Sequence, residues 1–135
     1  MNNIVFTAYS KKNFYNKNFI SAFVLENDMI PINPFLNYDY FLSDLVDRDK
    51  VRSANNALIN VSDELWVFGD IADGVYSEIN LAIEKNMKMR FFKLGSSVSD
   101  IKEVSIDDLN FESEIKEDLV KFKEKVNKYI EEWEK

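Results

Sequence analysis

Cysteine and histidine are both missing from this chain of 135 residues. Without cysteine the chain has no disulfide bonds, no thiol nucleophile and no thiolate zinc site. Without histidine it lacks the imidazole base and the commonest metal ligand of proteins. Catalysis would therefore depend on carboxylates, hydroxyls or lysine, and we expect no metal ion and no cofactor.

Glycine and proline are scarce, with 3 and 2 residues, while hydrophobic residues make up 46% of the chain. This composition excludes collagen-like and disordered chains and is typical of a folded domain. No run of about 18 apolar residues and no basic leader occurs, so we expect no membrane partner and a cytoplasmic protein. Basic residues are the minority, and the formal net charge of -7 argues against a nucleic-acid partner.

Short apolar runs typical of strands alternate with segments of helical periodicity. Strands are expected at residues 4–9, 29–32, 64–68, 87–92 and 101–104, and helices at 14–25, 37–46, 47–61, 75–85 and 114–133. This alternation predicts one α/β domain over residues 1–135, with a core at 4–94 and a C-terminal helical extension at about 112–135. We expect a three-layer, doubly wound, flavodoxin-like or Rossmann-like fold with a mostly parallel sheet of four to five strands. Pro31 suggests that the second strand lies at an edge.

The strand order 2-1-3-4-5 would open a ligand crevice where the first and third strands end. Tyr9 and Ser10 end the first of these strands, and Gly69 and Asp70 follow the third. All four are candidate substrate-binding residues. Lys11 could bind a 5′-phosphate at the start of the following helix, although a solvated loop lysine is the alternative.

Glu78 is the candidate nucleophile, because it follows Gly74 near the start of a helix and lies beside the buried stripe of that helix. The positive end of the helix dipole favours an ionised carboxylate there. Such a carboxylate can attack an anomeric carbon, although acidic residues also occur at helix starts for the dipole alone. Asp73 is either a second catalytic acid or the N-cap, and Asp70 either binds a ribose hydroxyl or is solvated.

Five features carry a resemblance to a known family: the opening strand Ile4 to Tyr9, the strand end Asn33-Pro34-Phe35, Asp63 before the third strand, the run Leu65-Trp66-Val67-Phe68-Gly69, and the helix start Gly74-x-x-x-Glu78-Ile79-x-x-Ala82. Over residues 4–94 the chain resembles the nucleoside 2-deoxyribosyltransferase-like proteins, which include nucleotide N-glycosidases and uncharacterised phage and bacterial relatives. The resemblance implies that Glu78 attacks the sugar C1′ of a nucleoside or nucleotide and releases the base. It also implies a homodimer or a larger assembly.

Two departures from the family pattern keep a second function open. Phe6 stands where the family commonly has a tyrosine, and Ala72 where it tends to have an aspartate. The alternative to an enzyme is therefore a module that binds a nucleotide or a nucleotide-derived signal without cleaving it. A third possibility is an interaction unit, because apolar residues repeat at heptad-like spacing between Ile115 and Trp133. Packing of this seam on the domain's own sheet is favoured over packing between subunits.

Overall fold

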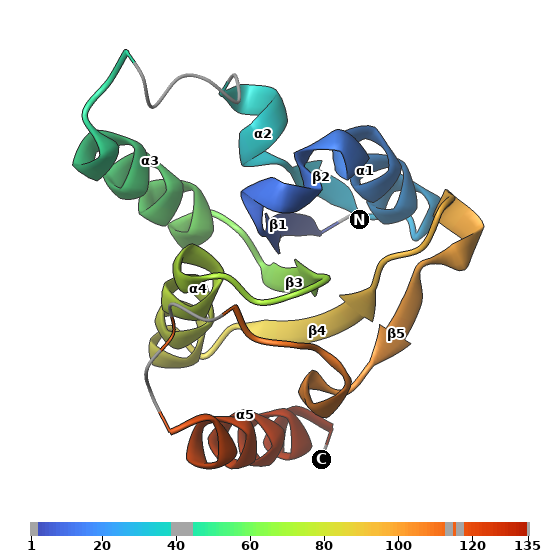
Figure 1. Cartoon of the computed structure of the whole chain (residues 1–135), viewed down its shortest axis with the longest axis vertical. Coiled ribbons are helices and arrows are strands. Elements are labelled where there is room, and N and C mark those ends of the chain that lie inside the picture. The colour runs from blue at the N-terminus through green and yellow to red at the C-terminus, as the bar shows by residue number, and fades with distance from the viewer. Residues whose placement is uncertain (1–2, 39–44, 113–114, 116–117, 135) are drawn as a thin grey trace.

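The computed structural model describes residues 3–38, 45–112, 115 and 118–134, and Figure 1 shows its layers. Five strands form one sheet in the order β2-β1-β3-β4-β5. Their bounds are β1 Ile4–Tyr9, β2 Ile30–Ile32, β3 Glu64–Phe68, β4 Lys88–Lys93 and β5 Lys102–Val104. β2, β1, β3 and β4 are parallel to one another, whereas β5 pairs antiparallel with β4. The predicted α/β fold and its strand order are confirmed.

Helices connect these strands and cover both faces of the sheet (Figure 1). The α-helices are α1 Lys17–Glu26, α2 Pro34–Asn37, α3 Arg48–Asn60, α4 Asp73–Glu84 and α5 Leu119–Glu134. In the described residues, short 3-10 helices accompany them: η1 Lys11–Asn16, η3 Val98–Asp100 and η4 Ile106–Asp108. In the described part of the chain, no helix is long and apolar enough to cross a membrane.

Side chains alternate along the strands between two apolar layers, because successive residues of a strand point to opposite faces. Phe6, Leu65 and Val67 pack in one layer with residues of α3, α4 and α5. Val5 and Trp66 pack in the other layer with residues of α1. Both central strands are therefore covered on both faces, which explains why their sequences are almost entirely apolar.

The edge position predicted for the second strand is confirmed, since β2 lies at the end of the sheet and its Pro31 pairs with Val5 of β1. The helix expected at 37–46 is wrong in the described residues, because only Asn37 is helical there, while Tyr38 and residues 45–46 are not. Helix α2 begins at Pro34, where the Asn33 side chain accepts a hydrogen bond from Phe35 N, and it ends at Asn37. Residues 39–44 of that prediction lie outside the described residues.

The C-terminal helix begins later than the expected residue 114. Asp118 precedes α5, and its carboxylate accepts a hydrogen bond from Lys121 N at 3.2 Å, as an N-cap does. Phe122 and Val126 are buried in the core of the chain itself, and Ile115 also belongs to that core. The heptad-like seam therefore packs on its own domain, as favoured above.

Candidate functional site

A cavity of about 660 Å³ lies at the carboxyl end of β1 and beside the start of α4. Parallel α/β sheets bind ligands at this edge, where the strand order reverses. The lining residues come from five places in the chain: Thr7, Tyr9, Ser10, Lys11 and Lys12; Pro34, Phe35 and Tyr38; Arg48, Val51, Arg52 and Asn55; Ala72, Asp73, Gly74, Val75 and Glu78; and Glu112.

Most of the candidate residues from the sequence lie together around this cavity. Those that line it are Tyr9, Ser10, Lys11, Asp73, Gly74 and Glu78. Gly69 and Asp70 are not among the lining residues. Gly69 instead faces Asn13 and Leu94, because a Cβ added to it would lie 3.0 Å from Asn13 Nδ2 and 3.1 Å from Leu94 Cδ1.

Glu78 projects from α4 into the cavity and is partly buried. Burial raises the pKa of the Glu78 carboxyl from 4.5 to about 8. A pKa change of that size corresponds to several kcal/mol, whereas a helix N-terminus contributes only about 0.3 to 1 kcal/mol to a nearby carboxylate. The carboxyl is therefore mostly protonated at pH 7 in the free protein, and the expectation of a resting ionised carboxylate is wrong.

Asp73 is not the N-cap of α4, which corrects one of the two roles considered for it. Ala72 occupies the N-cap position and makes no side-chain capping bond, while Asp73 is the first residue of the helix. The Asp73 carboxylate lies 3.7 Å from Arg52 Nη2 across the mouth of the cavity, and about half of each side chain is exposed. An acidic side chain in the first turn is also favoured by the helix dipole.

Tyr9 forms a fixed wall of the cavity. Its hydroxyl donates a 2.7 Å hydrogen bond to Asn33 Oδ1, and its ring lies 4.9 Å from that of Phe35. Asn33 is held in turn, because its Nδ2 donates to Lys17 O and to Ser21 Oγ. Burial raises the pKa of Tyr9 above its ordinary value, so its phenol stays protonated and acts as a hydrogen-bond donor.

Glu112 reaches the cavity from the C-terminal part of the chain. Ile71 N donates to Asn110 O at 2.8 Å, and Glu112 N donates to Ile71 O at 2.9 Å, so this segment forms a short parallel bridge next to β3. The Glu112 carboxylate accepts a 2.7 Å hydrogen bond from Ser10 Oγ and lies 3.5 Å from Lys12 Nζ. Sequence reasoning missed Glu112, since no local pattern indicates this long-range bridge.

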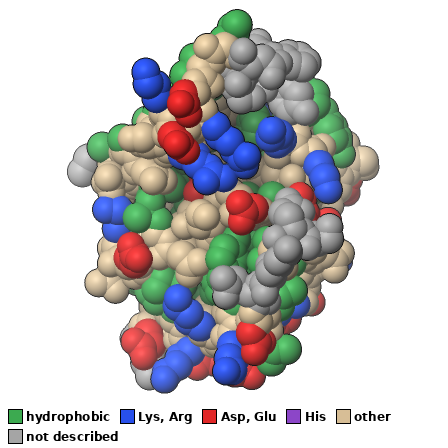
Figure 2. All heavy atoms as spheres, turned by 60° about the vertical axis from the view of Figure 1, so that its left-hand side comes forward, with side chains coloured by type: hydrophobic (Ala, Val, Ile, Leu, Met, Phe, Trp, Pro, Cys, Tyr) green, Lys and Arg blue, Asp and Glu red, His purple; other side chains and the backbone are tan. Residues whose placement is uncertain are grey.

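Cationic side chains gather at the mouth of the cavity, although the whole chain is acidic. Figure 2 shows Lys and Arg side chains grouped on this side of the molecule, with Asp and Glu side chains beside them. Lys12 pairs with Glu112, and Arg52 pairs with Asp73. Lys11 and Arg48 form no ion pair with any residue that the structure describes. With Glu78 protonated, the cavity therefore has an excess of positive charge.

Asn55 presents an unused acceptor to the same cavity. Its Oδ1 atom is buried and has no hydrogen-bond partner among the described residues. Buried polar atoms are nearly always paired, so an unpaired one at a cavity wall suggests that a ligand supplies the partner. On α3, Asn55 lies one turn after Val51 and two turns after Arg48, on the same face, but the sequence alone did not single it out.

Comparison with models of protein families gives a match. Residues 5–92 match a family described as a domain of unknown function, DUF7768. The chain belongs to this family. The matched region runs from the second residue of β1 to most of β4 and contains every residue that lines the cavity except Glu112.

Among the curated proteins, no match was found. Because the DUF7768 description names no activity, the resemblance to nucleoside 2-deoxyribosyltransferase-like proteins stays a prediction. Within the described ranges, no group of three or more acidic side chains is placed to hold a metal ion.

Proposed function

We propose that this DUF7768 protein cleaves the N-glycosidic bond of a nucleotide, with the Glu78 carboxylate as nucleophile and water as the final acceptor. The observation that carries the proposal is a partly buried glutamate of raised pKa in a cavity with a cationic mouth. The cavity volume of about 660 Å³ lies within the usual range of small-ligand sites, roughly 300 to 1,000 Å³. Strongly perturbed carboxyl groups in cavities are frequent at catalytic sites.

The reaction has two steps, as in retaining glycosidases. A Glu78 oxygen forms a bond to C1′ while the C1′–N bond breaks, and the base leaves with that electron pair and takes a proton from water. Water then attacks C1′ and releases the Glu78 carboxylate, with its proton passing to solvent. A second base in place of water would give deoxyribosyl transfer.

The raised pKa is compatible with this role because the charges change during the reaction. The reactive form is the ionised carboxylate, which is the minor form at pH 7. The sugar ring gains positive charge as the base departs, and that charge stabilises the carboxylate more in the transition state than in the free protein. Base release is therefore expected to accelerate as the pH approaches 8.

Two further observations favour a nucleotide over a nucleoside. Lys11 and Arg48 lie at the cavity without ion-pair partners among the described residues, and a phosphate group would supply the missing negative charge. The unpaired Asn55 Oδ1 would accept a hydrogen bond from a sugar hydroxyl or an exocyclic amino group.

A non-catalytic nucleotide-binding module is the second candidate function. It is favoured by the neutral state of Glu78 at pH 7, since a protonated carboxyl donates a hydrogen bond but does not attack. Phe6 stands where nucleoside 2-deoxyribosyltransferase-like proteins commonly have a tyrosine. It is fully buried in the core and offers no hydroxyl to the site. Tight binding of a nucleotide without any release of base would identify this alternative.

Chromatography of base released from a panel of ribonucleoside and deoxyribonucleoside 5′-monophosphates tests the proposal. The native protein is expected to release base from at least one of them. Glu78→Gln should lower the rate by at least about a thousandfold, because the amide is not a nucleophile. Glu84→Gln, an exposed glutamate on the same helix, should leave the rate unchanged. Full activity in Glu78→Gln would exclude the proposed nucleophile.

The homodimer implied by the family resemblance is part of the same proposal. Sedimentation of the active protein would test it, and a monomer that releases base at the full rate would show that the site is complete in one chain.

A further inference from the structure

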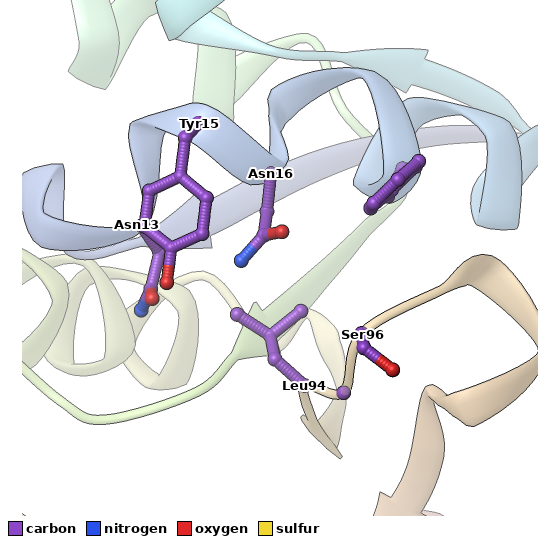
Figure 3. A pocket seen from close by; sticks show the side chains of 7 residues that line it. Asn13, Tyr15, Asn16, Leu94 and Ser96 are labelled. Atoms are coloured by element: carbon purple, nitrogen blue, oxygen red, sulfur yellow. The ribbon is translucent and has the colours of Figure 1, made fainter.

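A second cavity of about 550 Å³ shares no lining residue with the site described above. Its lining residues are Asn13, Tyr15, Asn16, Phe19, Leu94, Gly95 and Ser96. They come from η1, from the start of α1 and from the segment that follows β4. Figure 3 shows the side chains of Asn13, Tyr15 and Asn16 on one wall and Leu94 and Ser96 on the facing wall.

The lining of this cavity carries no formal charge, in contrast to the first one. None of its residues is acidic or basic, although charged residues make up 30% of the chain. Bringing a charged ligand into such a cavity would cost hydration energy with no ion pair to offset it. The lining therefore suits an uncharged ligand.

Asn16 is the residue that indicates a ligand. Its side chain is only 6% exposed and lines the cavity, where its amide points toward the space above Leu94 (Figure 3). Although Asn16 is at the N-cap position of α1, its side chain makes no capping bond. The Asn16 amide also forms no hydrogen bond with any other described residue. The amide therefore offers one acceptor and two donors to a ligand in the cavity.

Aromatic rings complete the site. Tyr15 is 69% exposed and Phe19 is 41% exposed, and both line the cavity. Exposed aromatic rings beside a polar amide can stack on a flat ligand while the amide bonds its edge. The amide of Asn13 adds a second polar group at the same wall.

The geometry points to a second small-molecule site, distinct from the Glu78 cavity, for an uncharged planar heterocycle with a hydrogen-bond donor next to an acceptor, such as a free nucleobase. The Asn16 amide would form two parallel hydrogen bonds with that edge, in the way asparagine pairs with N6 and N7 of adenine. The ligand ring would lie against Leu94 and stack on Tyr15. This inference does not depend on the proposed function.

The three glycines of the chain provide a direct readout in solution. Gly95 lines the second cavity, Gly74 lines the first, and Gly69 lies next to Asn13 and Leu94. Adenine is titrated into the ¹⁵N-labelled chain, and the three glycine amide signals are followed by NMR. A saturable shift of the Gly95 signal with an unchanged Gly74 signal is expected. No saturable shift at Gly95, or a shift at Gly74 in its place, would overturn the inference.

Variants and a second ligand test the hydrogen bonds. Asn16→Leu should weaken adenine binding by at least about tenfold, and purine, which lacks the 6-amino group, should bind the native chain more weakly by a similar factor. Asn18→Leu, at an exposed position of α1, is the matched control and should bind normally. Equal affinity of Asn16→Leu and the native chain would contradict the inference.

Tyr15→Ala provides a test that does not depend on a buried substitution, since Tyr15 is largely exposed. Loss of the stacking partner should weaken adenine binding several-fold without changing the sedimentation of the chain. A change of assembly state in Tyr15→Ala, with unchanged adenine affinity, would show that the exposed rings serve a protein contact and would overturn the inference.

Discussion

The carboxyl group of Glu78 determines how the first cavity responds to pH. Its pKa is about 8 in the folded protein and close to 4.5 when the chain is unfolded. Between these two values the folded state keeps a proton that the unfolded state has lost. This contribution to stability is therefore complete below about pH 4.5 and is lost as the pH rises through about 8.

The native protein should become less stable relative to Glu78→Gln as the pH rises from 5 to 9. The expected change in the difference of unfolding free energy is on the order of a few kcal/mol, since glutamine has no proton to lose. Urea unfolding of both proteins at several pH values measures this difference. Parallel stability curves would show that the carboxyl is not held in its neutral form.

The site residues at the carboxyl end of β1 could be predicted from the sequence, whereas Gly69 and Asp70 after β3 were predicted but do not line the cavity, and residues positioned by long-range contacts were not predicted. Tyr9 and Ser10 line the cavity because β1 ends there, which the apolar run 4–9 predicts. Arg48 and Arg52 share a helix face in the sequence, yet only the packing of α3 shows that this face borders the cavity. The neutral state of Glu78 also depends on its surroundings, which sequence spacing does not reveal.

At the scale of elements, the turn between β3 and α4 positions the start of the helix that carries Glu78. Gly69 has a φ of +75°, a left-handed conformation that favours glycine. Its Cα faces Asn13 and Leu94, so there is little space for a side chain. Gly74, in contrast, lies in the first turn of α4 and would have nothing within 4 Å of an added Cβ.

The two glycines should therefore respond oppositely to alanine. Gly69→Ala should destabilise the protein by roughly 1 to 3 kcal/mol, because the backbone conformation is strained and the neighbouring side chains must move. Gly74→Ala should be neutral or stabilising by up to about 1 kcal/mol, because alanine favours the helix. Thermal and urea unfolding measure both. Equal effects of the two substitutions would contradict the described turn.

Most helices and strands could be predicted because the spacing of apolar residues agrees with the positions of the turn-forming residues along most of the chain. The strand expected at 64–68 matches β3, since the short apolar run Leu65–Phe68 is typical of a strand covered on both faces. The helix expected at 37–46 was wrong because Pro34 begins α2 earlier and Tyr38, in extended backbone, ends it. The antiparallel direction of β5 was not predicted, since its three residues carry no direction signal.

At the scale of the whole molecule, a net charge of -7 opposes the approach of an anionic ligand. The Lys and Arg side chains at the cavity mouth must attract the ligand at short range against this repulsion. Of these side chains, Lys11 and Arg48 have no ion-pair partner among the described residues. Selection of a nucleotide over a nucleoside therefore depends on few side chains.

Arg48→Ala should raise the KM for a nucleoside 5′-monophosphate by about tenfold and leave the KM for the matching nucleoside unchanged, because only the phosphate contact is lost. Added salt should weaken nucleotide binding to the native protein and have less effect on the variant. Lys50→Ala, at an exposed position of the same helix outside the cavity lining, is the control. An equal loss for nucleotide and nucleoside would argue against phosphate recognition by Arg48.

The covalent sugar–enzyme intermediate is the most direct test of the whole account. A nucleotide that releases base is mixed with the protein, quenched with acid during turnover and analysed by peptide mass spectrometry. We predict a sugar-phosphate adduct on Glu78 in the native protein and in Glu84→Gln, and none in Glu78→Gln. Base release with the adduct on another residue, or with no adduct on Glu78, would contradict the account.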